Sequence, residues 1–198
     1  PGDPAQLIDA YPAALQAGAD FCAVLTEHPR AKELLTPFVV VREQQGELIA
    51  VPYSVEYEDD MTSIAQHLRA AADAIEPLEG EAALRTYLRA AADGFESNVW
   101  TDADEAWSRM NAENSKWYVR IAPDEVYWDP CARKAGFHMT LARIDPSSLE
   151  WQRKLTAVQQ QMEDRIAEAV GAPYVAREVT FHMPDFITIV TNHGDDRE

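Results

Sequence analysis

The spacing of apolar residues changes near Trp117, and this change limits the folds that the chain can adopt. Before it, apolar side chains recur every three or four residues, as in the segment 62–75, and this period predicts helices. After it, apolar and polar residues alternate, which predicts strands. Helices and strands that occupy separate stretches of a chain are typical of an α+β fold.

The 198 residues are expected to form one lobe made of three stretches. Residues 1–60 are expected to hold a helix over the first 35 residues and then a hairpin with Gly46 in its turn. Residues 61–116 are expected to be helical, and residues 117–198 to form strands with one long helix at 147–170. The strands are predicted at 37–41, 47–51, 117–122, 136–144, 174–183 and 186–192.

The chain has 34 Asp and Glu against 17 Lys and Arg, so its formal net charge is −17. Such a surface repels nucleic-acid phosphates and anionic lipid headgroups, and we expect neither a nucleic acid nor a membrane as a partner. No apolar run approaches the roughly 18 residues of a membrane span. Solubility explains the charge most simply, and a cationic substrate explains it more specifically. The acidic stretch 52–60 is expected to be a solvated connector.

The two cysteines, Cys22 and Cys131, match no metal or redox spacing. They can form one disulfide, but nothing in the sequence requires it. The first residue, Pro1, indicates a trimmed, processed or recombinant chain, and the stretch after it lacks the basic patch and apolar segment of a signal peptide. The compartment stays open: a cytoplasmic protein is favoured, and a periplasmic one requires that a leader has been removed.

No catalytic apparatus can be assembled from these residues alone. None of the five histidines lies in a zinc-binding motif, and the sequence has neither a glycine-rich phosphate loop nor a nucleophile elbow. We therefore expect no metal site in this chain.

The segment 121–130, IAPDEVYWDP, places Glu125 and Tyr127 two residues apart in an extended stretch. Alternate residues of a strand point to the same face, so a carboxylate and a phenol are expected to share one face. One interpretation is an edge strand whose polar side chains face water. The other is a pair that captures a peptide N-terminus, because the carboxylate can bind an ammonium ion and the phenol can donate to a carbonyl.

The stretch 120–144 resembles a segment of the dipeptidyl peptidase III enzymes that reads I-G-x-x-E-S-Y-R-D-P and leads into G-x-F-E-G-F. The residues in register are Ile121, Glu125, Tyr127, Asp129, Pro130 and Phe137. The preceding residues are similar to the peptidase-like half of plant Nudix hydrolases, a divergent branch of that family. The matching segments are PYSVEY (52–57), AAADAIE (70–76) and LRAAADGFESNVWTDADEAW (88–107), and the whole resemblance spans roughly residues 50–190.

The resemblance implies both a fold and a function. These enzymes are zinc exopeptidases with two lobes and a cleft between them, and one lobe combines helices with a small β-barrel. This chain would be the lobe without zinc, the N-terminal part of a larger enzyme. Glu125 would pair with the ammonium group of a peptide substrate, and Tyr127 would support the backbone of its first residue. Further candidate cleft residues are Trp128, Asp129, Lys134 and His138.

This sequence also departs from the family pattern. The H-E-x-x-x-H helix and the glutamate ligand that follows it are absent from these 198 residues. Zinc would therefore be held by a partner chain or by a missing C-terminal segment, and the expected partner is a second polypeptide that carries the zinc-binding helices. Ala122 and Trp128 replace a Gly and an Arg, so substrate contacts there are expected to differ.

Three hypotheses follow from these residues. In the first, the chain is the substrate-binding part of a split or processed zinc metallopeptidase. In the second, a binding or regulatory protein uses the same fold to grip N-termini without hydrolysis. In the third, an enzyme with different chemistry uses the fold, since function depends on sites and not on folds. The helix at 147–170 and the last strands have apolar faces that need a neighbour, which favours a tightly bound companion.

Overall fold

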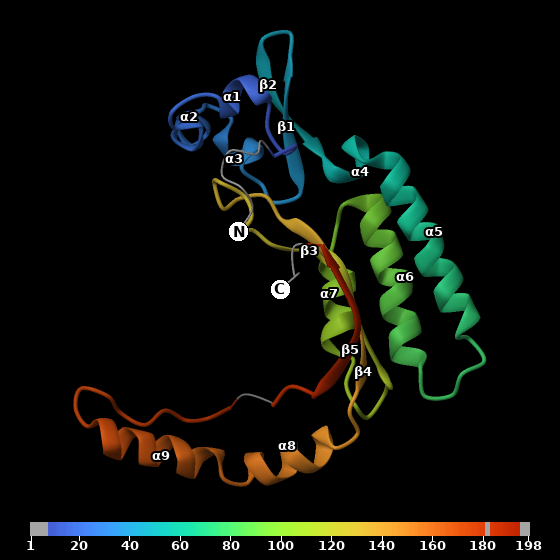
Figure 1. Ribbon diagram of the computed structural model, residues 1–198, viewed down its shortest axis with the longest axis vertical. Helices are drawn as coiled ribbons and strands as arrows, with labels where there is room; N and C mark the ends of the chain where they lie inside the picture. Colours follow the sequence, from blue (N-terminus) through green and yellow to red (C-terminus); the bar gives the residue numbers. More distant parts are fainter. Residues whose placement is uncertain (1–7, 181–182, 195–198) are drawn as a thin grey trace.

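The computed structural model describes residues 8–180 and 183–194 (Figure 1). Within these ranges, each helix is too short or too polar to cross a lipid bilayer. In chain order the elements are α1 (Ala13–Gln16), α2 (Phe21–Glu27), α3 (Ala31–Leu34), β1 (Val39–Gln44), β2 (Glu47–Pro52), α4 (Tyr53–Glu56), α5 (Glu58–Ala74), α6 (Ala82–Ser97), α7 (Thr101–Ser108), β3 (Trp117–Glu125), β4 (Gly136–Ile144), α8 (Ser148–Thr156), α9 (Gln159–Val170) and β5 (Ile187–Gly194).

The N-terminal region contains three short helices, so the prediction of one helix over the first 35 residues is wrong; residues 1–7 lie outside the described part of the chain. The helices are separated where the sequence interrupts them. The side chain of Asp20 accepts a hydrogen bond from the amide of Ala23 at 3.0 Å and starts α2. Pro29 then separates α2 from α3, because proline is poorly tolerated inside a helix.

The predicted hairpin is confirmed: β1 and β2 pair in antiparallel register. Its turn contains Gln45 and Gly46, both with positive φ (54° and 82°). The acidic stretch that follows is not a solvated connector as predicted, because it forms α4 and the first turn of α5. Tyr53 in α4 and Met61 in α5 are buried, and their burial favours helix over loop here.

The central helices α5, α6 and α7 confirm the helical character of the middle stretch. They pack with α4 and β1 around the main hydrophobic core, in which Tyr87 and Phe95 of α6 are almost completely buried. The Tyr87 hydroxyl accepts a hydrogen bond from the Ile121 amide at 2.8 Å, which joins α6 to the first strand of the second sheet. Asn98, in the left-handed conformation, ends α6 and donates its side-chain amide to the Phe38 carbonyl.

The second sheet has three antiparallel strands in the order β3-β4-β5. The expected α+β fold is therefore confirmed, with antiparallel sheets. The expected barrel-like closure is not found, since the described strands form one two-stranded and one three-stranded sheet and no closed barrel.

After β4 the chain leaves the body as an arm, which we define as residues 148–180 and 183–186: α8, α9 and the segment that runs back beside them (Figure 1). The predicted single helix at 147–170 is broken between α8 and α9, at Ala157 and Val158. The strand predicted at 174–183 is also wrong for residues 174–180 and 183, and residues 181–182 lie outside the described ranges. The backbone of Arg177 and Val179 in this segment forms hydrogen bonds with the side chains of Gln160 and Glu163 in α9. These bonds replace those that a neighbouring strand would make.

Candidate functional site

The two residues that carry the sequence hypothesis lie at the end of β3. Glu125 is its last residue and pairs with Gly136, after an irregularity in the ladder at Pro123. Tyr127 lies beyond the strand, in a turn where the Asp129 amide donates to the Val126 carbonyl at 3.2 Å. The sequence predicted that both side chains share one face of an extended stretch, but β3 ends at Glu125, so one strand does not hold both residues.

Glu125 differs sharply from the acid that precedes it. Asp124 accepts two hydrogen bonds from Arg120, one of them at 2.6 Å, and lies 3.5 Å from Nε2 of His138. Glu125 is exposed, and among residues 8–180 and 183–194 it makes no ion pair and no side-chain hydrogen bond. A carboxylate in this position can bind an external cation without first breaking an internal interaction.

The turn presents two aromatic side chains beside this carboxylate. The Tyr127 ring is 58% exposed and the Trp128 ring 37%, and their centroids are 6.0 Å apart. Both rings thus present apolar surface to solvent next to an acid, an arrangement common in sites that hold a ligand by stacking and one charge.

The next two candidates, Asp129 and Lys134, are buried inside the loop 126–135. Asp129 accepts hydrogen bonds from the Tyr11 hydroxyl at 2.9 Å and from the amides of Arg133 and Lys134. Burial, with Asp129 as the next cause, raises the pKa of Tyr11. These contacts fix the loop onto the N-terminal helices.

Lys134 reaches the same N-terminal region. Its ammonium donates to the carbonyls of Leu34 and Thr36 and lies 5.7 Å from the centre of the Tyr11 ring. Burial lowers the pKa of Lys134 to about 8, although the nearby Asp129 carboxylate opposes this change. Asp129 and Lys134 are therefore buried and bind internal partners, whereas Glu125 is exposed and the Tyr127 and Trp128 rings are partly exposed.

His138 lies in the middle of the sheet, where it is opposite Ala122 on β3 and Gly194 on β5. It is 9% exposed and belongs to a charged cluster with Asp124 and Arg120. Asp104 of α7 also binds Arg120, at 2.8 Å, so this cluster joins the sheet to the helices.

A disulfide, which the sequence analysis left open, fixes the loop covalently. Cys22 of α2 and Cys131 form a disulfide across 109 positions. Spacing alone could not reveal it, because two distant cysteines become neighbours only when the loop folds back onto the N-terminal helices. The loop that carries Tyr127 is thus tied down covalently as well as by hydrogen bonds.

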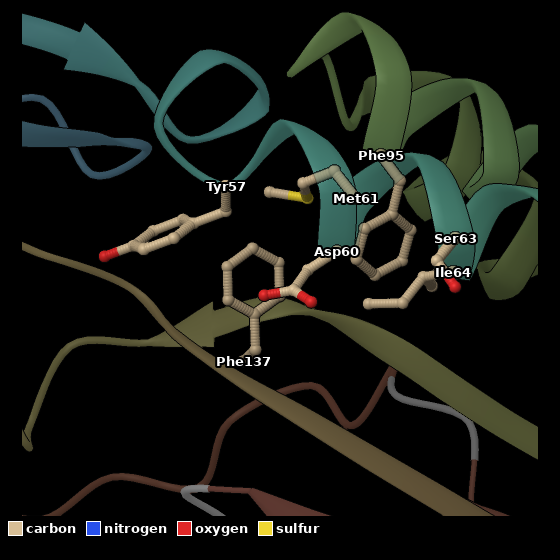
Figure 2. A pocket seen from close by; sticks show the side chains of 7 residues that line it. All are labelled: Tyr57, Asp60, Met61, Ser63, Ile64, Phe95 and Phe137. Atoms are coloured by element: carbon tan, nitrogen blue, oxygen red, sulfur yellow. The ribbon is translucent and has the colours of Figure 1, made fainter.

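A pocket of about 400 Å³ opens near the same end of the sheet (Figure 2). Phe137, which follows the Gly136 that pairs with Glu125, forms one wall. The rest of the lining comes from Tyr57, between α4 and α5, and from the helices α5 and α6. Met61, Ile64 and Phe95 supply apolar surface, and Tyr57, Asp60 and Ser63 supply polar groups. Apolar walls with few polar groups are typical of small-ligand and side-chain sites.

The described residues do not form a metal centre: within 8–180 and 183–194, no group of three or more His, Cys, Asp or Glu could hold an ion. Within the described ranges no donor set fits zinc, and we assign these residues no step that involves a metal.

The helices and the two antiparallel sheets define an α+β fold. Comparison with solved structures identifies the relatives. The chain is similar to dipeptidyl-peptidase III from Caldithrix abyssi (27% identity, TM-score 0.78) and from Corallococcus sp. strain EGB (26% identity, TM-score 0.69). The matches cover 93% of this chain and 34% and 33% of those chains. The predicted resemblance to dipeptidyl peptidase III is confirmed, and the chain spans about a third of the length of the matched proteins.

Two other comparisons gave no result, since no protein-family model and no curated protein matches the sequence.

Proposed function

We propose that this chain is the substrate-binding part of a dipeptidyl peptidase III-like zinc metallopeptidase. In this proposal it forms one lobe of a two-lobed enzyme and grips the free N-terminus of a peptide. The zinc-binding helices belong to a complementary polypeptide, which is either a second chain or a further segment of the same one.

The structural match supports the proposal most strongly. It extends over 93% of the chain at a TM-score of up to 0.78, and both matched structures are of dipeptidyl-peptidase III. The open carboxylate of Glu125 adds a specific chemical reason, because a protonated amine is the group that a free peptide N-terminus offers.

The recognition chemistry follows from the two side chains. The Glu125 carboxylate accepts hydrogen bonds from the substrate ammonium and neutralises its charge. The Tyr127 phenol donates to the carbonyl of the first peptide residue, and Trp128 supplies apolar surface beside it. The high negative charge of the chain attracts such a cationic terminus from a distance and raises its rate of association.

Glu125→Gln tests the proposal, since it preserves the shape of the side chain and removes its charge. In the complete assembly, the change is expected to lower kcat/KM for peptides with a free N-terminus. The loss should correspond to about 2–3 kcal/mol of transition-state stabilisation. N-acetylated peptides carry no ammonium and should be used equally by both enzymes. Equal losses for the two peptide classes would disprove the assigned role.

Glu43→Gln is the matched control, because Glu43 is also an exposed acid on a strand and lies in β1, outside the turn. It should leave both peptide classes unaffected. Intact mass analysis of the native assembly, together with quantification of its metal, tests the remaining part of the proposal. One zinc and a complementary polypeptide are expected with each copy of this chain.

A further inference from the structure

A second pocket lies where the arm joins the body, and we call it the root pocket. It has a volume of about 480 Å³, within the roughly 300–1,000 Å³ of small-ligand sites. Its walls come from the end of α7, the start of β3, the end of β4 and the segment that leads into β5. Trp117 is the first residue of β3 and Glu125 is the last, so the root pocket lies at the opposite end of this strand from the candidate site.

Three aromatic side chains line the root pocket: Trp107, Trp117 and Tyr118. The rings of Trp107 and Tyr118 meet edge to face, with their centroids 6.0 Å apart. The face of an aromatic ring carries partial negative charge and attracts cations. Two contacts within the fold already show this attraction. The Arg120 guanidinium lies 4.9 Å from the centre of the Trp107 ring, and the Arg143 guanidinium lies 5.8 Å from the centre of the Trp117 ring.

These two arginines oppose a further cation only weakly. Arg120 forms ion pairs with both Asp104 and Asp124, so its charge is compensated within the fold. Arg143 is exposed, and water and salt screen its charge. The aromatic walls can therefore attract a cation that enters the root pocket.

Asp185 supplies a carboxylate to the wall of the root pocket. It accepts hydrogen bonds from the Ala112 amide and from the Gln152 side chain, each at 2.7 Å. Both donors are neutral, and within residues 8–180 and 183–194 Asp185 makes no ion pair. A second acid, Glu113, is exposed in an adjoining hollow that Asp185 also lines. The root pocket thus combines aromatic walls with a negative charge that no cation of the described residues neutralises.

The walls also limit the kind of cation that fits. A primary ammonium carries three N–H donors, and each needs an acceptor. The polar side chains of the root pocket are few: Asp185, which already accepts two hydrogen bonds, Ser108, whose hydroxyl donates to the Glu105 carbonyl at 2.8 Å, and Tyr118. The rest of the lining is apolar: Met110, Ile144, Pro184 and Ile187. A quaternary ammonium has no N–H group and presents methyl groups to the rings, so it leaves no donor unsatisfied.

We propose that the root pocket binds a small organic cation with a quaternary ammonium group. The aromatic rings attract the cation through their faces, and the Asp185 carboxylate compensates its charge. This inference does not depend on the proposed function, because the two sites lie at opposite ends of β3. Their ligands differ as well, since a free peptide N-terminus carries N–H donors and a quaternary ammonium carries none.

Choline is the test probe, and 3,3-dimethylbutan-1-ol is its neutral isostere, in which a carbon atom replaces the quaternary nitrogen. Each compound is titrated into the full 198-residue chain at constant ionic strength, because a chain with a net charge of −17 attracts every cation to some extent. The indole N–H signals of the tryptophans are followed by NMR. Choline should shift the signals of Trp107 and Trp117 and leave those of Trp128 and Trp151 in place. The neutral alcohol should bind at least about tenfold more weakly, since it lacks the attraction to the rings and to Asp185.

Trp117→Leu tests the aromatic wall, since it removes the ring and keeps an apolar side chain. It should weaken choline binding about fivefold or more, and Asp185→Asn should weaken it as well. Trp151→Leu is the matched control, because Trp151 also has a cation near its ring, the Lys154 ammonium at 5.0 Å, but does not line the root pocket. It should bind choline as the wild-type chain does. The comparison of choline with its neutral isostere uses the wild-type chain, so it tests the inference even where a variant does not fold.

Equal affinity for choline and the neutral alcohol would overturn the inference, because the root pocket would then select apolar groups without regard to charge. Wild-type affinity of a folded Trp117→Leu chain would overturn it too.

Glu125→Gln separates this inference from the proposed function. The variant should bind choline normally and lose only recognition of free N-termini. Loss of choline binding in this variant would place the ligand beside the Tyr127 and Trp128 rings and overturn the root pocket. Normal choline binding together with equal use of free and acetylated peptides would refute the proposed function and leave the root pocket supported.

Discussion

Removal of the disulfide between Cys22 and Cys131 offers a direct test of how the loop 126–135 is held. The bond joins residues 109 positions apart, and it restricts the unfolded chain accordingly. For a closed loop on the order of 100 residues, the lost entropy corresponds to about 4.7 kcal/mol at 25 °C. Measured losses on removal of native disulfides in small domains are roughly 2–5 kcal/mol, so we expect a value within that range.

The perturbation is Cys22→Ser combined with Cys131→Ser, which removes both sulfurs and leaves no reactive thiol. With a urea dependence of about 2 kcal/mol per molar, the loss should lower the unfolding midpoint by at least about 1 M. Dithiothreitol should lower the midpoint of the wild-type protein by a similar amount and have no effect on the double variant. Hydrogen exchange should accelerate first in the loop and not in α6, because α6 belongs to the separate main core.

Two results would refute this reasoning. A midpoint shift below about 0.3 M would mean that the hydrogen bonds of the loop alone hold it in place. Alkylation of both cysteines in the native, unreduced protein would mean that the bond is not formed.

Three further predictions concern buried or hydrogen-bonded charges. The Lys134 ammonium should titrate near pH 8 by NMR; since the fold lowers its pKa from 10.5, its contribution to the free energy of unfolding rises between about pH 8 and 10.5. Hydrogen bonds from Arg177 and Tyr174 lower the pKa of Glu163 to about 2, so protection of the Arg177 amide, which donates to Glu163, should persist above the usual value of 4.5 and be lost as the pH falls from there to about 2. Arg120→Met leaves two acids without their buried cation and should cost about 3–5 kcal/mol in urea unfolding, whereas Arg69→Met, at an exposed pair, should cost about 1 kcal/mol or less.

The sequence predicted well the elements that local periodicity determines. The hairpin β1–β2 and the helices α5 and α6 each bury a face that recurs at a fixed spacing, so their apolar pattern and their packing agree. The strands β3 and β4 were predicted for the same reason, since their alternating residues pack on helices on one side of the sheet.

The predictions failed where contacts between parts of the chain that are distant in sequence determine the structure. The segment 174–180 alternates like a strand, but Gln160 and Glu163 of α9 bind its backbone amides, so no second strand is needed. The break at Ala157 and Val158 contains neither glycine nor proline and is invisible to residue propensities. Spacing alone likewise could not indicate that Asp129 faces the Tyr11 hydroxyl, 118 positions away.

The contrast between two neighbouring acids gives the candidate site its strongest physical argument. Asp124 is bound by Arg120 and approached by His138, so its charge is compensated within the fold. Glu125, one residue later, has no such compensation among the described residues, and it belongs to a chain whose net charge is already −17. A further exposed negative charge adds to the repulsion within such a chain, and a bound cation would reduce it. The end of β3 therefore separates a carboxylate bound within the fold from an exposed one, and Glu125→Gln should raise the stability of the isolated chain slightly and, under the proposed function, weaken recognition of an amine.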